Sequence, residues 1–295
     1  MADSVGMADL RKENVSKIVT GFALQEYRMK QFCMVQTSNS WKETYFRETA
    51  SDLTAGGTRN IRGVSRLSKF PYGEVTWTET SSRLQKHAFE GTISWEDANT
   101  NEFDVVARTL LRISRGIAKS VDVAIWETIS DKVTSVPGDG SAGINTVAIT
   151  AGNEWDSATI ANRDPIDNIL NAKQTIAEEN YNPEGAYLLL NPKDFRNLLG
   201  NPNIRNAGQF YTDDVTRNGR VGRLLGLNII VSNSVTADYA LIVVGGEACT
   251  WKSAEDLIVD TIYDPGIKIT IRAWEVGVPQ LKNPKAVCLI SNTAV

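Results

Sequence analysis

Residues Glu102 to Asp131 read EFDVVARTLLRISRGIAKSVDVAIWETISD, and this stretch decides the fold. Apolar side chains recur every three or four positions, which places them on one face of an α-helix. The main row is Phe103, Val106, Leu110, Ile113, Ile117, Val121 and Ala124, continued by Thr128, and a second row is Leu111, Ala118, Ile125 and Ile129. At 1.5 Å per residue, such a helix spans about 45 Å and can cross a whole domain. Its other face is expected to be an exposed surface, with Arg108, Arg112, Arg115, Lys119 and Asp122.

The segment before this helix is typical of strands. Residues 74–80 (EVTWTET) and 86–95 (KHAFEGTISW) alternate in polarity, which indicates two half-exposed strands of one extended hairpin. Residues 58–74 form a basic limb with one acid, Glu74, against four bases: Arg59, Arg62, Arg66 and Lys69. A two-stranded ribbon is marginally stable alone, so it needs a surface, which could belong to another subunit. The alternative is a charged, solvated loop.

The rest of the chain mixes helices and strands. Residues 8–35 indicate a helix broken near Gly21 and then an extended piece, an arm that could pack on its own domain or on a neighbouring subunit. After the long helix, helices are predicted at 164–180, where Asp164 and Pro165 form the start, and at 193–199. Strands are predicted at 146–150, 187–190, 227–232, 239–244, 257–263, 267–276 and 286–290. The class is therefore α+β.

The composition argues against several classes of function. The 295 residues are 42% hydrophobic with a net charge of -4, which gives no case for nucleic-acid binding along the whole sequence. The three cysteines are widely spaced without a C-x-x-C, so neither a zinc site nor a disulfide framework is indicated. No apolar run approaches about 18 residues, and the N-terminus has no signal core. We expect a soluble, unsecreted protein without a membrane segment.

A glycine cluster follows the long helix. Residues 137–145 (PGDGSAGIN) contain Gly138-x-Gly140-x-x-Gly143, the spacing of a dinucleotide-binding fingerprint. That fingerprint must follow a strand and open a helix, so that the pyrophosphate meets free N–H groups at the helix N-terminus. Here the glycines follow a helix and precede a strand. We therefore predict a loop that binds no cofactor.

Candidate catalytic residues are sparse. His87 is the only histidine, and we expect it at the surface. A nucleophilic site would need a serine or cysteine beside it, and no nucleophile elbow occurs. The neighbouring acids Glu178-Glu179 and Asp213-Asp214 point apart rather than converge on a metal. We predict a protein that is not an enzyme, with no catalytic, metal-binding or cofactor-binding residues.

The order of these elements resembles the major capsid protein of tailed phages (Caudoviricetes). That fold was first described for phage Hong Kong ninety-seven and is shared with herpesvirus shell floors and encapsulins. A strand-rich loop precedes a long helix that runs into residues 137–140 (PGDG), and residues 188–195 (LLLNPKDF) are similar to the family's apolar strand, Asn-Pro and helix. Further similar segments follow in order: 225–231, 240–246, 249–251, 278–279 and 283–286. The resemblance covers about residues 55–295.

The resemblance implies an architecture. It is an α+β phage major-capsid-type fold with an N-terminal arm, an extended β-hairpin loop, a peripheral domain that holds a spine helix and a β-sheet, and an α/β axial domain. The arm would be residues 1–50 and the extended loop 51–96. The peripheral domain would be 97–150 and 262–295, with the spine helix at 102–131. The axial domain, 151–261, would gather at the centres of hexamers and pentamers.

The resemblance also implies a function. The chain would be a major capsid protein that self-assembles into hexamers and pentamers, forming the icosahedral shell around the double-stranded DNA of a tailed virus. Some family members carry a large N-terminal scaffolding segment that is cleaved after assembly. We expect no room for such a segment in this chain, so a separate scaffold, or none, is implied. A portal is implied as a further partner, and it stays open whether a decoration protein also binds. DNA would be enclosed without sequence-specific contacts. The protein would be found in the virion capsid, after assembly in the host cytoplasm.

In this family the extended loop lies over the next subunit on the outer face. The implied contact residues are Arg59, Arg62, Arg66, Lys69, Phe70, Tyr72 and Trp77. We expect the basic limb to meet acidic rims of that subunit rather than packaged DNA. Some members also form Lys–Asn crosslinks, for which Lys69 and Asn283 are the residues in matching segments; nothing in the sequence shows that they meet beside a carboxylate.

Two other classes stay open. An encapsulin-like nanocompartment shares the fold but encloses an enzyme cargo. An α/β enzyme with an unrecognised site would form a small oligomer of fixed size.

Overall fold

The computed structural model describes residues 17–23, 27–48, 65–69, 77–100, 105–202, 204 and 223–294. Its helices and strands confirm the predicted α+β class. The chain divides into two compact units. The first is drawn from Met1–Glu43, Ser82–Trp126 and Thr250–Gln280, and the second from Thr44–Ser81, Glu127–Cys249 and Leu281–Val295.

The first unit is built on a four-stranded sheet with the spatial order β1-β10-β11-β4. Its strands are β1 (Met34–Thr37), β10 (Cys249–Asp264), β11 (Lys268–Leu281) and β4 (Gln85–Ser94). The short strand β1 is parallel to β10, whereas β4 is antiparallel to β11 along its whole length. The strands predicted at 257–263 and 267–276 thus belong to two longer strands that form the centre of this sheet.

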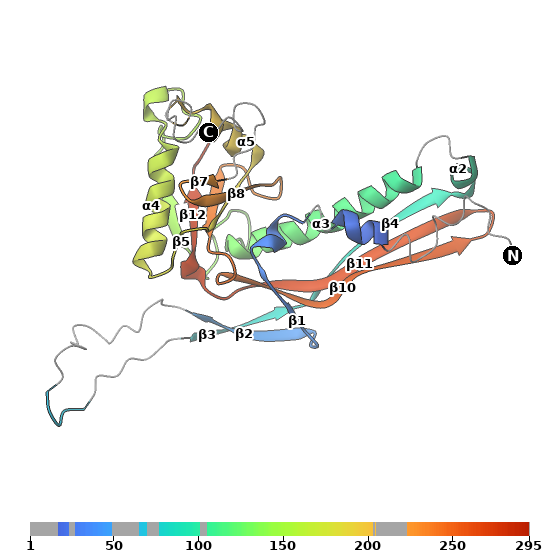
Figure 1. Ribbon diagram of the computed structural model, residues 1–295, viewed down its shortest axis with the longest axis horizontal. Coiled ribbons are helices and arrows are strands. Elements are labelled where there is room, and N and C mark those ends of the chain that lie inside the picture. Colours follow the sequence, from blue (N-terminus) through green and yellow to red (C-terminus); the bar gives the residue numbers. More distant parts are fainter. Residues whose placement is uncertain are drawn as a thin grey trace. The chain divides into compact units, whose positions relative to one another are not determined.

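The predicted long helix is present as α3 (Val105–Ile129), which runs alongside β4 and β11 (Figure 1). Most described members of its two apolar rows are buried as predicted, with exposures of 1% or less at Leu110, Ile113, Ile117, Val121 and Ile125. Burial of each such side chain contributes about 1.5–3 kcal/mol, so they anchor the helix to the sheet. The described members that are only half-buried are Leu111, Ala124 and Thr128. Residues 101–104 lie outside the described part of the chain.

Gly91 lets β4 approach α3 closely. A Cβ atom at this position would lie 2.8 Å from Cγ2 of Thr109 and 3.0 Å from Cδ1 of Ile113. A larger residue would therefore push strand and helix apart. Because side chains alternate along a strand, His87 and Ile93 share the helix-facing side of β4 with Gly91.

The two predicted hairpin strands exist, but they do not pair with each other. β3 (Trp77–Arg83) pairs with β2 (Lys42–Glu48) in a separate ribbon, whereas β4 pairs with β11. The predicted hairpin over residues 74–95 was therefore wrong in its strand partners. Only Leu84 separates β3 from β4, and a hairpin needs a loop of at least about two residues. Alternating polarity identified both strands but contained no information on their partners.

The second unit contains a six-stranded mixed sheet with the order β5-β12-β9-β6-β8-β7. Its strands are β5 (Asn145–Ala148), β12 (Val287–Ser291), β9 (Tyr239–Val243), β6 (Tyr187–Leu190), β8 (Leu227–Val231) and β7 (Arg223–Leu224). Helix α4 (Pro165–Glu178) packs against β12 and β5. Leu188, Leu189 and Leu190 are fully buried, as predicted for a strand covered on both faces.

Two helices of this unit begin at a side-chain cap, and the cap at Asp164 was predicted. The carboxylate of Asp164 accepts a hydrogen bond from the N–H of Asp167 at 3.2 Å, ahead of α4. The side chain of Asn191 accepts one from the N–H of Lys193 at 3.0 Å, ahead of α5 (Pro192–Gly200). Each cap is followed by a proline, whose missing N–H costs nothing in the first turn.

The remaining elements are short. They are α2 (Trp95–Thr100) and the 3-10 helices η2 (Met29–Gln31), η3 (Ile160–Asn162) and η4 (Pro284–Ala286). Residues 17–23 are helical through Gly21, so the predicted break at this glycine was wrong.

The glycine cluster after α3 forms a loop, as predicted. The Asp139 carboxylate accepts hydrogen bonds from the N–H groups of Val133, Thr134 and Ser135 at 2.6, 3.0 and 3.0 Å. Gly140 is required because a Cβ there would lie 2.8 Å from the carbonyl oxygen of Asp131. The N–H groups of residues 133–135, which precede the glycine motif, thus bind the loop's own aspartate.

Candidate interaction surfaces

The β2–β3 ribbon exposes aromatic side chains. Phe46 on β2 is 59% exposed and Trp77 on β3 is 56% exposed. The alternate side of β2 is held by its own unit, where Tyr45 is buried and Nε of Arg47 donates to the carbonyl oxygen of Leu281 at 3.4 Å. One side of the ribbon is thus attached, and the other presents aromatic area to solvent.

The basic limb is described only in part. Arg66 and Lys69 have exposed side chains in segment 65–69, where Ser68 donates from its N–H and its hydroxyl to the carbonyl oxygen of Ser65, at 3.2 and 2.7 Å. With Trp77, these are the predicted contact residues that the structure places. The others lie outside the described residues: Arg59, Arg62, Phe70 and Tyr72. Their role in a contact stays a prediction.

The charged face of α3 is exposed along most of its length. The side chains that reach solvent are those of Arg108, Arg112, Arg115 and Lys119, as predicted. We call these four residues the cationic face.

Asp122, which was predicted to share this exposed surface, is only 4% exposed, so that prediction was wrong. Residues 27–31 cover this end of the helix, and the Asp122 carboxylate accepts hydrogen bonds from the N–H groups of Arg28 and Met29, at 3.2 and 3.1 Å. Burial raises the pKa of Asp122 to about 6, although these hydrogen bonds and the nearby Lys30 lower it. The helical period placed the aspartate on the correct side, but it could not identify the covering segment.

A buried ionic cluster holds the N-terminal segment against the sheet. Glu275 on β11 is 1% exposed and accepts a hydrogen bond of 2.5 Å from the hydroxyl of Tyr27. Glu275 also forms an ion pair with Lys30, whose Nζ lies 4.1 Å from the centre of the Tyr27 ring and 5.0 Å from that of Trp251. Burial raises the pKa of Tyr27 far above its usual range, so its hydroxyl remains a donor.

The sequence reasoning missed this cluster. One signal was present, because Glu275 shares the inward side of β11 with Ile271 and Ala273, both of which are buried. An acid at an inward position requires a partner. The partners lie 245 and 248 positions away, in a segment whose sequence pattern shows no preferred neighbour.

His87 is buried, so the prediction of a surface histidine was wrong. It is 7% exposed, and its Nδ1 lies 2.9 Å from Oγ of Ser120 on α3. Among the described residues its Nε2 has no hydrogen-bond partner. Burial chiefly, and then Lys30, lower the pKa of His87, while Glu275 opposes them. His87 therefore packs as a neutral ring between β4 and α3.

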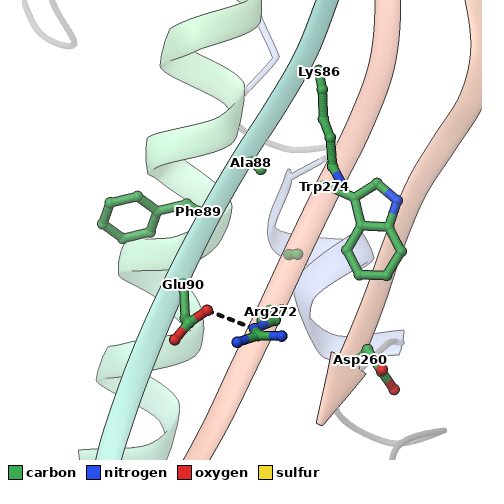
Figure 2. A pocket seen from close by; sticks show the side chains of 8 residues that line it. Lys86, Ala88, Phe89, Glu90, Asp260, Arg272 and Trp274 are labelled. Atoms are coloured by element: carbon green, nitrogen blue, oxygen red, sulfur yellow. Dashed lines mark hydrogen bonds and ion pairs between the residues drawn. The ribbon is translucent and has the colours of Figure 1, made fainter. Parts of the chain in front are cut away.

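A pocket of about 350 Å³ lies over β4, β10 and β11 (Figure 2). Its polar groups are already paired, since Nε of Arg272 donates to Glu90 at 2.6 Å and Nζ of Lys86 lies 5.0 Å from the ring centre of Trp274. Figure 2 shows Phe89 turned away from Trp274, towards α3. The groups that could recognise a ligand thus bind one another, and the pocket is typical of a solvent-exposed face of a sheet.

Within the described ranges, no helix is long and apolar enough to cross a membrane. The same ranges contain no cluster of three or more His, Cys, Asp or Glu residues that could hold a metal ion. Cys33, Cys249 and Cys288 are buried and form no disulfide.

These features define a class of protein. A long helix packed on a sheet, a ribbon with exposed aromatic residues and a second α/β unit together form the Hong Kong ninety-seven capsid fold. Many solved structures share it, of which three illustrate the likeness. The capsid of Cyanophage P-SCSP1u has a TM-score of 0.64 at 14% identity, over 88% of this chain and 86% of that one. A virus-like particle from Pyrococcus furiosus has a TM-score of 0.62 at 12% identity, over 95% of this chain and 98% of that one. A phage-related protein from Bordetella bronchiseptica has a TM-score of 0.62 at 14% identity, over 95% of this chain and 96% of that one.

The family follows from a sequence model. The model described as phage capsid protein matches residues 77–290, more than half of the chain. No curated protein matches the chain by sequence. The chain belongs to the phage capsid protein family and is a major capsid protein. Its place is the capsid of the virion, and its role is that of a structural, oligomeric protein.

Proposed function

We propose that copies of this protein assemble as hexamers and pentamers into an icosahedral shell around the double-stranded DNA of a tailed virus. The observation that supports this proposal is the β2–β3 ribbon, with Phe46 and Trp77 exposed. A two-stranded ribbon is marginal in water, and aromatic residues are enriched where proteins associate. A neighbouring copy gives the ribbon the surface that it needs. Head-to-tail contacts of this kind close into rings when the rotation permits.

In the proposed shell, the extended loop of one copy lies over the next. Its contact residues are Arg59, Arg62, Arg66, Lys69, Phe70, Tyr72 and Trp77. The basic members pair with acidic rims of the neighbouring copy. In a protein of net charge -4, this division of charge fixes the register of neighbours more than their affinity.

The proposed parts of the subunit follow the same scheme. The N-terminal arm is residues 1–50, and the extended loop is 51–96. The peripheral domain is 97–150 and 262–295, and the axial domain is 151–261, which gathers at the ring centres. Assembly takes place in the host cytoplasm, with a portal and a separate scaffold as further partners, and a decoration protein stays an open partner. DNA is enclosed without contacts to its sequence.

A second candidate is an encapsulin-like compartment around an enzyme cargo. The observation in its favour is the likeness to the virus-like particle from Pyrococcus furiosus, which concerns the fold alone at 12% identity. The match to the phage capsid family favours the viral shell. The two candidates differ in what the shell contains, nucleic acid or protein.

The test is size-exclusion chromatography of the expressed chain, followed by electron microscopy. We expect megadalton shells, rings of five or six, or tubes, either from the chain alone or after coexpression with a scaffold. A monomer or dimer that never assembles under either condition contradicts the proposal. Nuclease-resistant nucleic acid within the shells supports a viral shell, and copurified enzyme supports a compartment.

A further inference from the structure

The cationic face of α3 is a continuous row. At 3.6 residues per turn and 1.5 Å per residue, Arg108, Arg112, Arg115 and Lys119 fall within an arc of about 60° and span about 16 Å along the axis. Between Val105 and Val121 the helix carries no acidic residue. Like charges three and four positions apart destabilise a helix. The row therefore opposes the stability of its own helix and fits a partner of opposite charge.

The next acid along the helix after this row is covered. Asp122 follows Lys119 on the same side of α3, but the N–H groups of Arg28 and Met29 bind its carboxylate. On the helix itself, no acid interrupts the row, in a protein whose net charge is negative.

The chemistry of this face indicates the kind of partner. No large apolar side chain of the described part of α3 is exposed. The core of a protein–protein interface is apolar, rich in aromatic residues and poor in charge. Contacts to a nucleic-acid backbone, in contrast, are made mainly by Arg and Lys and need no apolar area. We propose that the cationic face binds the phosphate backbone of double-stranded DNA without reading its sequence.

This inference rests on the proposed function, and it assigns the surface that meets the enclosed genome. One row offers at most about four phosphate contacts per copy, which gives weak binding that salt readily screens. Apart from the basic limb, which we assign to the neighbouring copy, the rest of the chain is acidic and repels DNA, so the polyanion is directed to this face. In a shell, many such rows act together, and their weak contacts add.

The test compares two matched triple variants of the full chain. Arg108→Gln/Arg112→Gln/Lys119→Gln removes three charges from the cationic face, and Lys17→Gln/Arg196→Gln/Lys268→Gln removes three exposed charges from other elements. Arg115 is left unchanged because it also interacts within its own chain. Circular dichroism and urea unfolding first establish that both variants fold. A single variant, Lys119→Gln, provides a milder change.

The probe is a fluorescein-labelled random duplex of about 30 base pairs, followed by anisotropy at several concentrations between about 50 and 200 mM salt. We expect the first triple variant to bind about tenfold or more weakly at low salt, and its log–log salt slope to fall by up to about three. Lys119→Gln lowers the slope by about one. The matched control retains the wild-type slope to within about one. Equal binding by both triple variants overturns the proposal.

A second pair of measurements separates other partners. Binding of the wild-type chain to polyglutamate but not to the duplex indicates an acidic protein partner and overturns the proposal. Loss of rings and shells by the first triple variant, in nuclease-treated samples, identifies the face as a subunit contact and also overturns it. Intact assemblies that no longer bind DNA support it. Failure of the wild-type chain to assemble contradicts the proposed function alone, because DNA binding is compared on the chain in either state.

Discussion

The hydroxyl of Tyr27 donates a hydrogen bond of 2.5 Å to Oε2 of Glu275, a residue 248 positions further along the chain. Both side chains are buried, and Lys30 completes the cluster through an ion pair with the same carboxylate. A buried carboxylate needs such partners, because an unpaired charge is costly in the interior. The contact therefore fastens the N-terminal segment to the centre of the β10–β11 sheet.

Tyr27→Phe should destabilise the unassembled protein by about 1–3 kcal/mol. The reason is that Glu275 loses one hydrogen bond without regaining water. Urea unfolding followed by circular dichroism measures the change. The matched control is Tyr263→Phe, since Tyr263 is 46% exposed and its loss should stay within about 0.5 kcal/mol. Equal stabilities of the two variants would show that the cluster does not hold the segment.

The raised pKa of Asp122 predicts how the stability of the folded protein changes with pH. Burial raises its folded pKa from 3.8 to about 6, against the positive charges of Lys30 and Arg28 and two N–H hydrogen bonds. The folded state therefore binds the proton more tightly than the unfolded chain, and the resulting stability is complete below about pH 4 and lost as the pH rises through about 6.

Relative to Asp122→Asn, the wild-type protein should be more stable at about pH 4 than at about pH 7.5, by on the order of 1–3 kcal/mol. Urea unfolding of both proteins at the two pH values and near pH 6 gives this difference directly. Titration of other groups cancels between the two proteins. A difference that stays constant across the range contradicts the raised pKa.

Local patterns predicted most of the fold. The period of α3, the Asp164 cap and the apolar strand at 187–190 depend on neighbours a few positions away, and the structure contains each of them. The strand partners depend on residues far apart. β3 pairs with β2 and β4 with β11, and neither choice can be derived from alternation alone.

The surface was harder to predict than the core. Arg108 and Lys119 are exposed as the helical period predicts, but Asp122 and His87 are covered by segments distant in sequence. A pattern shows which side of an element is polar; it does not show what packs on that side. The predicted contacts of the extended loop lie between subunits, so a single chain leaves them as predictions.

Asp139→Asn should loosen the loop after α3. The hydroxyl of Thr134, followed by the N–H groups of Val133 and Ser135, holds the pKa of Asp139 well below its usual range. This contribution is present above the usual aspartate pKa and is lost only as the pH falls below it. Hydrogen exchange at residues 133–136 should be faster in the variant at neutral pH, while wild-type protection persists to about pH 5. Glu247→Gln, an exposed acid elsewhere in the same unit, serves as the control; a similar change in both variants would contradict the role of Asp139.

Phe46→Ser/Trp77→Ser should abolish assembly and leave folding intact. Both side chains are more than half exposed, so their loss should change the unfolding free energy of the unassembled protein by about 0.5 kcal/mol or less. Electron microscopy and size-exclusion chromatography measure assembly. Val133→Ser removes an apolar side chain that is 71% exposed elsewhere in the same unit and should assemble normally. Normal shells from the double variant would show that this side of the ribbon has no partner.

The last prediction concerns the basic limb. Reversing Arg59, Arg62, Arg66 and Lys69 to glutamate should block assembly, because acidic rims of the next copy would then repel the limb. The equivalent reversal of Lys17, Arg196, Arg223 and Lys268, all exposed, changes the net charge equally and should be tolerated. Like charges across an interface cost several kcal/mol, whereas scattered surface charges are largely screened. Raising the salt concentration should therefore partly restore assembly of the first variant. Shells that form normally from that variant at low salt would exclude an electrostatic role for the limb and leave the aromatic side chains of the ribbon as its contact.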